Sequence, residues 1–106
     1  MTRNKYNAKK VRADGYIFDS QAEARHYEEL KLLERAGEIT EIRVHPIFQI
    51  EIEGRPICKV ILDFAFIDKN GSDIFQDVKG VSTALSKLKK KMVEAAYGID
   101  VEIVRK

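Results

Sequence analysis

The sequence predicts a single α/β domain in which the elements follow the order helix, three strands, helix, strand. Two segments carry apolar residues at helical spacing, and the segments between and after them alternate or run continuously apolar. Glycines and an Asn-Gly pair separate these segments. The chain has 106 residues, of which 44% are hydrophobic, which is enough for one core. We therefore expect residues 1–106 to fold as one domain.

The chain opens with a basic segment and a short hairpin. Residues 1–12 contain Arg and Lys but no acidic residue, and we expect residues 1–10 to form a mobile basic arm. Residues 11–18 are typical of a hairpin, because Asp14-Gly15 at their centre tolerates the positive φ angles of a tight turn.

The first helix is predicted over residues 20–36 and ends at Gly37. The second is predicted over residues 83–97 and ends at Gly98. The expected apolar stripe of the first helix is Tyr27, Leu30 and Leu33, and that of the second is Leu85, Leu88, Met92 and Ala95.

Three strands are predicted between the helices, over residues 47–53, 57–67 and about 73–79. The first alternates apolar and polar residues, as a half-buried strand does. The second is apolar on both faces, which is typical of a central strand that is covered on both sides. A final strand is expected from Ile99 to Val104, after the second helix.

Asp63 lies within the most apolar of these strands, where an isolated ionised carboxylate would be very costly. It must therefore be paired, protonated or bound to a metal. Asp77 and Lys79 are two residues apart on the next strand, so their side chains leave the same face, roughly 6.6 Å apart along the backbone. Two carboxylates and one ammonium group can then reach a single point, provided that the strand register allows it.

The loop at Asn70-Gly71 decides this register. A two-residue loop would place Asp63 opposite Val78, so that Asp63 and Asp77 would face opposite sides of the sheet. A three-residue loop over residues 69–71, with Gly71 left-handed, would place Asp63 opposite Asp77. We expect the three-residue loop, because two unpaired acids on opposite faces would be energetically unfavourable.

Glu23 is the third acid, and two interpretations of it are open. It lies four residues before Tyr27 and therefore borders the buried face of the first helix. Ser20 and Glu23 also match a capping box, with Ser20 as the N-cap and Glu23 at the third helical position. The interpretations are compatible, because a cap would hold the carboxylate at the start of the helix.

Clustered carboxylates favour a hard divalent cation such as Mg²⁺, which prefers oxygen ligands. Such an ion activates water and neutralises the charge that develops on a scissile phosphate, and Lys79 could orient the water or stabilise the phosphate. A structural Asp–Lys pair is the alternative. The acid-x-Lys pattern is weak alone, since Glu29-Leu30-Lys31 in the first helix matches it too.

The chain resembles the PD-(D/E)XK nuclease superfamily, and in particular its short phage and prophage proteins related to Holliday-junction resolvases. The similarity rests on residues 18–25, 62–64 and 77–80 and on the lysine-rich second helix. It implies a restriction-endonuclease-like core, namely helix, three-stranded meander, helix and strand. In that core a mixed sheet is flanked by helices, to which this chain adds its N-terminal hairpin and basic arm.

The resemblance also implies a role for each site residue. Asp63 matches the first aspartate, Asp77 the second acid, Lys79 the lysine and Glu23 the helix glutamate. All four would be catalytic, and the three acids would hold Mg²⁺, for which Mn²⁺ would substitute. Leu62 stands where the family name has proline, and Asp77 is one methylene shorter than the glutamate that is also found there.

The expected function is a Mg²⁺-dependent endonuclease that hydrolyses phosphodiester bonds of DNA, selective for branched structures in phage recombination, repair or replication. A homodimer would cut two strands symmetrically. The basic clusters would bind phosphates, although such runs are commonly just solvated surface. Their members are Lys5, Lys9, Lys10, Arg12, Lys87, Lys90 and Lys91.

Other functions stay open from the sequence: a non-catalytic nucleic-acid-binding or assembly protein with the same fold, an RNA nuclease, or a phage protein that interacts with its host. Cys58 is the single cysteine, which excludes an internal disulfide and a thiolate zinc site. His26 and His45 lack spaced metal-binding partners and are expected to be structural or exposed. No apolar stretch approaches the roughly 20 residues that span a bilayer. We expect a cytoplasmic protein of a bacterial host, encoded by a phage or prophage, with no membrane association and no small-molecule cofactor.

Overall fold

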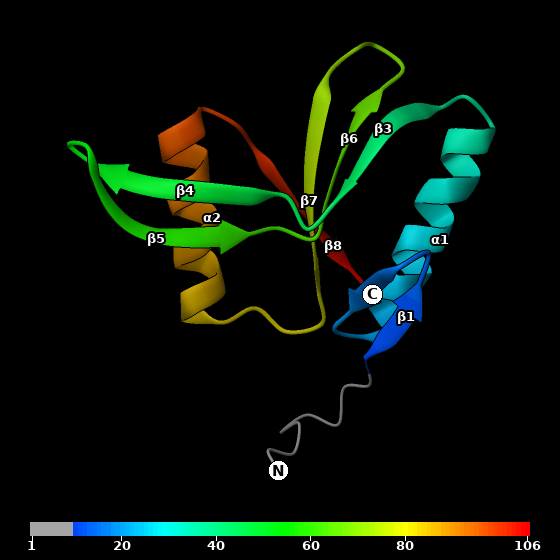
Figure 1. Cartoon of the computed structure of the whole chain (residues 1–106), viewed down its shortest axis with the longest axis horizontal. Coiled ribbons are helices and arrows are strands. Elements are labelled where there is room, and N and C mark those ends of the chain that lie inside the picture. Colours follow the sequence, from blue (N-terminus) through cyan, green and yellow to red (C-terminus); the bar gives the residue numbers. More distant parts are fainter. Residues whose placement is uncertain (1–9) are drawn as a thin grey trace.

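The computed structural model describes residues 10–106 and has an α/β architecture with two helices and eight strands (Figure 1). The elements are β1 (Val11–Ala13), β2 (Tyr16–Phe18), α1 (Gln21–Arg35), β3 (Ile39–Val44), β4 (Ile47–Ile52), β5 (Arg55–Ile61), β6 (Phe64–Asp68), β7 (Asp73–Lys79), α2 (Ala84–Tyr97) and β8 (Val101–Arg105). A four-stranded sheet with the order β3-β6-β7-β8 lies at the centre. Its β7–β8 pair is parallel and its other pairs are antiparallel, so the predicted α/β class with a mixed sheet and two helices is confirmed.

The N-terminal hairpin and α1 cover one face of this sheet. The β1–β2 turn is formed by Asp14 at φ 50° and Gly15 at φ 82°, as predicted. Below it lies an aromatic core that joins the hairpin, α1 and β6, and its central members are Phe18, Tyr27 and Phe64. Leu33, expected in the apolar stripe of α1, is 42% exposed, because the buried face of the helix is centred on Tyr27 and Leu30.

The strand predicted over residues 57–67 is in fact two strands. β5 ends at Ile61 and β6 begins at Phe64, with Leu62 and Asp63 between them. β5 pairs with β4 in a separate two-stranded sheet, whereas β6 belongs to the central sheet. Val60 and Leu62 pack in a core with α2, whereas Phe64 and Phe66 pack in a core with α1. A single strand that was covered on both sides was therefore the wrong interpretation.

The first strand of the central sheet is β3, which the sequence analysis missed. Its apolar alternation is broken by a register shift between Thr40 and Arg43, where Glu41 adopts a φ of 53°. The predicted strand over residues 47–53 is β4, which ends at Ile52 and lies outside the central sheet. The central sheet thus begins one strand earlier than predicted, and β4–β5 is an additional hairpin.

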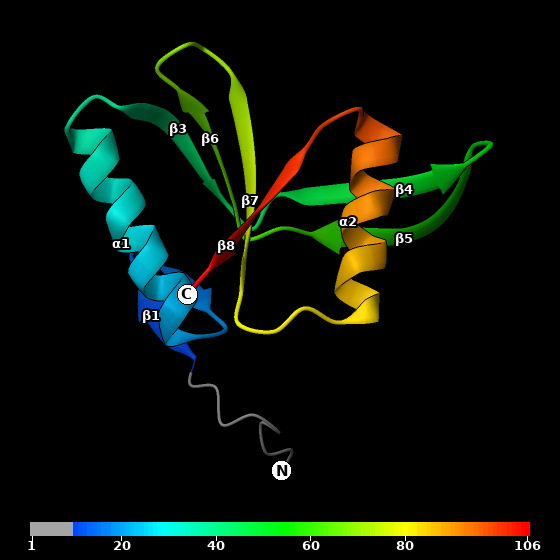
Figure 2. The same ribbon diagram turned by 180° about the vertical axis from the view of Figure 1, so that it is seen from behind.

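The β4–β5 hairpin leaves the central sheet and returns to it at one point. The N–H of His45 donates to the carbonyl of Asp63 (3.0 Å), and the N–H of Leu62 donates to the carbonyl of Pro46 (3.0 Å). Figures 1 and 2 show the hairpin extending away from the central sheet, on the side opposite α1. These two hydrogen bonds join residues 45–46 to residues 62–63 at the point where the hairpin leaves the sheet, and we call this junction the fork.

α2 packs against this hairpin. Its start at the N-cap Thr83 and its end at the left-handed Gly98 are as predicted. The predicted inward face is confirmed only at Met92, which packs against the core. Leu85 and Leu88 are 59% and 52% exposed, and the fully buried residue is Val93. A two-stranded hairpin covers only a narrow face of a helix, which explains the difference. Neither helix of residues 10–106 combines the length and apolarity that a bilayer crossing requires.

Candidate functional site

Asp63 and Asp77 lie opposite each other, as the three-residue loop predicts. The β6–β7 ladder pairs Phe64 with Gln76, and the same register places Asp63 opposite Asp77. The loop is closed by a hydrogen bond from the N–H of Gly71, at φ 82°, to the carbonyl of Asp68 (3.0 Å). The predicted register is therefore confirmed, and it brings the two acids to the fork of the sheet.

The two aspartates are held through main-chain hydrogen bonds. Asp63 Oδ2 accepts from the N–H of Val78 (2.7 Å), and Asp77 Oδ1 accepts from the N–H of Asp63 (3.2 Å). Each carboxylate thus uses one oxygen to tie the two strands together, and each keeps its second oxygen for another partner.

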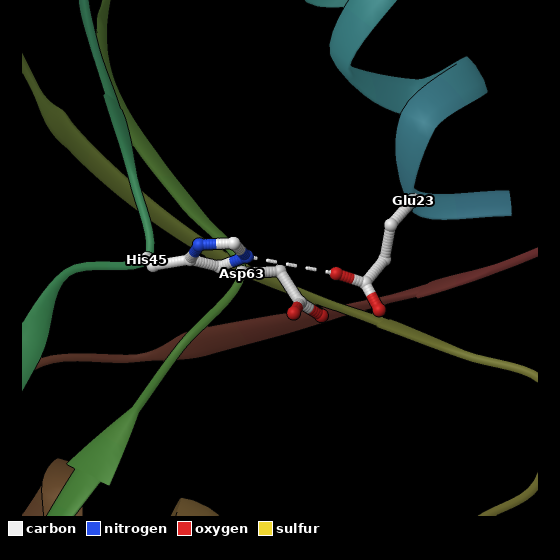
Figure 3. Close-up of side chains that lie close together, drawn as sticks. All are labelled: Glu23, His45 and Asp63. Carbon is white, nitrogen blue, oxygen red and sulfur yellow. Dashed lines mark ion pairs between the residues drawn. The ribbon is translucent and has the colours of Figure 1, made fainter. Parts of the chain in front are cut away.

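Glu23 and His45 join Asp63 in one compact group, in which one ligand atom from each residue lies within 4.8 Å of the others. Figure 3 shows the three side chains converging from separate segments. Glu23 comes from the first turn of α1, His45 from the link between β3 and β4, and Asp63 from the link between β5 and β6. Two carboxylates and an imidazole are a donor set that fits a divalent metal ion.

The carboxylate of Glu23 is turned into this group and does not complete a capping box. Ser20 Oγ accepts from the N–H of Glu23 (3.1 Å), but the return bond to the N–H of Ser20 is absent from the hydrogen bonds of residues 10–106. Glu23 is 8% exposed, and its Oε1 is buried without a hydrogen-bond partner among residues 10–106. Such an atom is costly unless a ligand satisfies it.

Burial determines the protonation of the acids. Desolvation raises the pKa of Asp63 to about 8, the charges of Glu23 and Asp77 raise it further, and the Val78 N–H opposes them. Desolvation also raises the pKa of Glu23 above its ordinary value, although a hydrogen bond with Asp63 counteracts it. Without a cation Asp63 therefore holds a proton near neutral pH, and a divalent ion would displace it.

His45 is the residue that the sequence analysis did not place in the site. Its Nε2 lies 3.8 Å from Glu23 Oε1, and its backbone adopts the left-handed φ of 55°. Pro46 follows it and has no N–H with which to continue the β3 ladder. The His45-Pro46 pair could have indicated the end of a strand and a histidine near the site. It was not used, because β3 itself was not predicted.

Asp77 and Lys79 form a pair beside this group and outside it. Lys79 Nζ lies 3.0 Å from Asp77 Oδ2, and both residues line a cavity of about 150 Å³ between β7, β5 and the start of α2. Lys89 lines the same cavity. The structure thus brings Glu23 and Asp63 together with His45, and it leaves Asp77 paired with Lys79.

The predicted phosphate-binding lysines of α2 lie away from this cavity. Lys87 and Lys91 are each two residues from Lys89, a rotation of about 200° that directs them to the opposite side of the helix. Lys90 pairs with Glu94 at 2.9 Å. Lys89, which the sequence analysis did not select, is the α2 lysine that lines the cavity with Asp77 and Lys79, because the helix is rotated relative to the predicted stripe.

The N-terminal basic residues are only partly described. Lys5 and Lys9, with most of the predicted arm, lie outside the described residues. Lys10 is exposed and pairs with Asp19 at 3.1 Å. Arg12 lines a larger cavity of about 560 Å³ between β1 and α1. That cavity includes none of the four predicted catalytic residues, so size alone does not identify the site.

Over residues 3–105 the chain matches the family described as "Protein of unknown function (DUF1064)". It belongs to this family. No curated protein and no solved structure matches the chain. The description of DUF1064 states no activity, so a function for this chain has to be argued from its site.

Proposed function

We propose that this DUF1064 protein is a metal-dependent DNA endonuclease of the PD-(D/E)XK type, which hydrolyses phosphodiester bonds. The observation that carries the proposal is the pairing of Asp63 with Asp77 at the fork of the sheet, with Lys79 two residues further along β7. The first acid, the second acid and the lysine of that superfamily correspond to these three positions.

The order of the elements supports the proposal. α1 is followed by β3, β6 and β7, which are consecutive neighbours in the sheet, and then by α2 and β8. This is the restriction-endonuclease-like succession of helix, three-stranded meander, helix and strand, if the β4–β5 hairpin is taken as an insertion. Glu23 in the first turn of α1 corresponds to the helix glutamate of the superfamily.

The residues present fit a divalent cation. Among the described residues, the buried Oε1 of Glu23 has no hydrogen-bond partner, and the pKa of Asp63 is raised. Both features mean that the ionised carboxylates lack a positive partner. Mg²⁺, or Mn²⁺ in its place, would supply positive charge to the scissile phosphate and acidify the attacking water. Glu23 and Asp63 would hold this ion, and Asp77 would join them if its carboxylate exchanged Lys79 for the ion.

Lys79 has two tasks in this mechanism. Its ammonium group, 3.0 Å from Asp77 Oδ2 and with a side chain 24% exposed, keeps Asp77 in place in the absence of substrate. On DNA binding it would donate to a phosphate oxygen or orient the attacking water. Lys89, in the same cavity, would contact an adjacent phosphate of the strand.

The proposal includes branched DNA as the substrate, a homodimer as the active form, and a bacterial cytoplasm in which phage or prophage DNA recombines. Symmetric cutting of a junction requires two active sites. Ile47 and Ile61 lie opposite each other on the outer face of the β4–β5 hairpin and are 63% and 58% exposed. These two exposed isoleucines mark the surface that we assign to the second copy.

The test uses purified protein with a four-way junction and a matched linear duplex, each with Mg²⁺, Mn²⁺ or EDTA. Asp63→Asn and Lys79→Ala are the site variants. Asp73→Asn, on the same strand as Asp77 but paired with Arg43 at its far end, is the matched control. We expect metal-dependent junction cutting by the wild type and by the control, and none by the site variants.

The other outcomes separate the parts of the proposal. Equal cutting of both DNAs retains the nuclease and removes the selectivity for branches. Tight DNA binding without cutting in any metal overturns the nuclease and favours a non-catalytic nucleic-acid-binding protein.

A further inference from the structure

We propose that His45 is a metal ligand, and that Glu23, His45 and Asp63 together bind a first-row transition ion in preference to Mg²⁺. The inference deepens the proposed function, since it names the class of ion that the nuclease site takes. Ion binding itself does not depend on cleavage, so the two can be tested separately.

The first support is the separation between His45 and Glu23. Nε2 of His45 and Oε1 of Glu23 are 3.8 Å apart, which is too long for a hydrogen bond. It is a suitable separation for two ligand atoms that each lie about 2.1 Å from one shared ion. The imidazole and the carboxylate thus face each other across a gap of the size that an ion fills.

The second support is Glu23 Oε1, which is buried and has no hydrogen-bond partner among the described residues. In this position Glu23 does not make the return bond of the capping box, so helix capping does not explain the orientation of its carboxylate. A buried carboxylate oxygen without a donor requires a cation or a proton. The atom is aimed at His45 and Asp63, as Figure 3 shows.

The third support is the backbone of His45. A non-glycine residue in the left-handed region at φ 55° carries strain, which persists where the surrounding structure imposes it. The hydrogen bond from the His45 N–H to the Asp63 carbonyl (3.0 Å) imposes it here. The strain thus holds the imidazole of one fork segment beside the carboxylate of the other.

The donor set determines the preferred ion. Mg²⁺ favours oxygen ligands and keeps its waters, whereas neutral imidazole favours ions such as Fe²⁺, Co²⁺ and Zn²⁺. One nitrogen and two carboxylates therefore shift the affinity toward transition ions, which also follow the general order of rising affinity from Mn²⁺ to Cu²⁺. Mg²⁺ would still be able to occupy the site through the carboxylates at its higher concentration.

The test measures ion binding to the full chain without DNA. Calorimetry gives Kd for Co²⁺ and Mg²⁺, with wild type, His45→Asn and the control Asp73→Asn. Asparagine tolerates the left-handed backbone and removes the imidazole. We expect the Co²⁺ Kd to rise at least about tenfold in His45→Asn and the Mg²⁺ Kd to change less than about threefold. His45→Gly, which also accepts φ 55°, serves if His45→Asn does not fold.

A spectroscopic readout identifies the ligand. The chain has two histidines, so His45→Asn leaves only His26, which is buried and hydrogen-bonded to Gln76 (2.7 Å). Pulsed EPR of bound Mn²⁺ should show imidazole nitrogen coupling in the wild type and none in His45→Asn. Unchanged Co²⁺ affinity, or nitrogen coupling that survives the substitution, would overturn the inference. Mg²⁺-dependent cleavage that does not need His45 would support the proposed nuclease and overturn the His45 ion site. Tight Co²⁺ binding without cleavage would support the ion site and overturn the nuclease.

Discussion

The two helices of the protein begin with the same kind of four-residue pattern and use it differently. At α2, Thr83 Oγ1 accepts from the N–H of Ser86 (3.1 Å) and Ser86 Oγ accepts from the N–H of Thr83 (2.9 Å), so the capping box is complete. At α1, Ser20 accepts from the N–H of Glu23 (3.1 Å), but the carboxylate of Glu23 turns toward His45 and Asp63.

The difference separates helix stability from chemistry at one position. In both helices the hydroxyl oxygen of the N-cap residue accepts a hydrogen bond from a backbone N–H of the first turn, which would otherwise be unsatisfied. α2 adds the second bond, whereas α1 leaves the carboxylate of Glu23 buried without a hydrogen bond at Oε1. A side chain at the third helical position can therefore serve the helix or the site, and here each helix shows one choice.

The largest expected effect is on activity. Glu23→Gln keeps the size of the side chain and removes its charge, so we expect the metal-dependent cleavage rate to fall by about 100-fold or more, as losses of transition-state stabilisation at such sites do. Asp73→Asn, which removes a carboxylate paired with Arg43 at the far end of β7, should leave the rate within about twofold. Initial rates on a junction substrate in Mg²⁺ measure both. Equal losses in the two variants would contradict the contrast.

The second effect is the pH dependence of stability in EDTA. The pKa of Asp63 is about 8 in the folded chain, against an ordinary value of 3.8, so the folded state holds the extra proton between these values. The free energy of unfolding should therefore be higher at pH 5 than at pH 8, by at least about 2 kcal/mol. Urea denaturation at the two pH values measures it. Asp63→Asn should remove most of this slope, and a slope of the opposite sign would refute the assignment.

The smallest effect concerns the caps themselves. Ser20→Ala and Thr83→Ala each remove one hydroxyl acceptor, and each should lower the free energy of unfolding by about 1 kcal/mol. The two losses should be similar, because Thr83→Ala keeps the backbone N–H that donates to Ser86 Oγ. Urea denaturation of the two variants at pH 5 compares them. A larger loss at Ser20 would mean that this cap also supports the carboxylate of Glu23.

Features that depend on neighbouring residues were predictable from the sequence. The starts of both helices follow from Ser20 and Thr83, and the end of α2 follows from Gly98, because these residues act through local hydrogen bonds and a left-handed φ. The register that sets Asp63 opposite Asp77 follows from the Asn70-Gly71 loop, because a turn determines which residues face each other in the hairpin it joins.

Features that depend on distant segments were not predictable in this way. The chain passes from one sheet to the other at Leu62 and Asp63, within the largely apolar segment 57–67. No Gly or Pro marks this point, so nothing local indicates the division. His45 enters the site only because the chain leaves the sheet beside the point where it returns. Lys89 lines the cavity of Asp77 because α2 packs against a hairpin, and the rotation of the helix depends on these tertiary contacts.

The closed fork has a consequence for protein engineering. The chain leaves the central sheet at His45 and rejoins it at Asp63, and two hydrogen bonds join these segments. They are therefore held together whatever the length of the β4–β5 hairpin between them. The tip of the hairpin, at Glu53-Gly54, is exposed and lies at the opposite end of β4 and β5 from the fork. A reporter peptide inserted at the tip should therefore leave Glu23, His45 and Asp63 in position, which makes the hairpin a natural graft point.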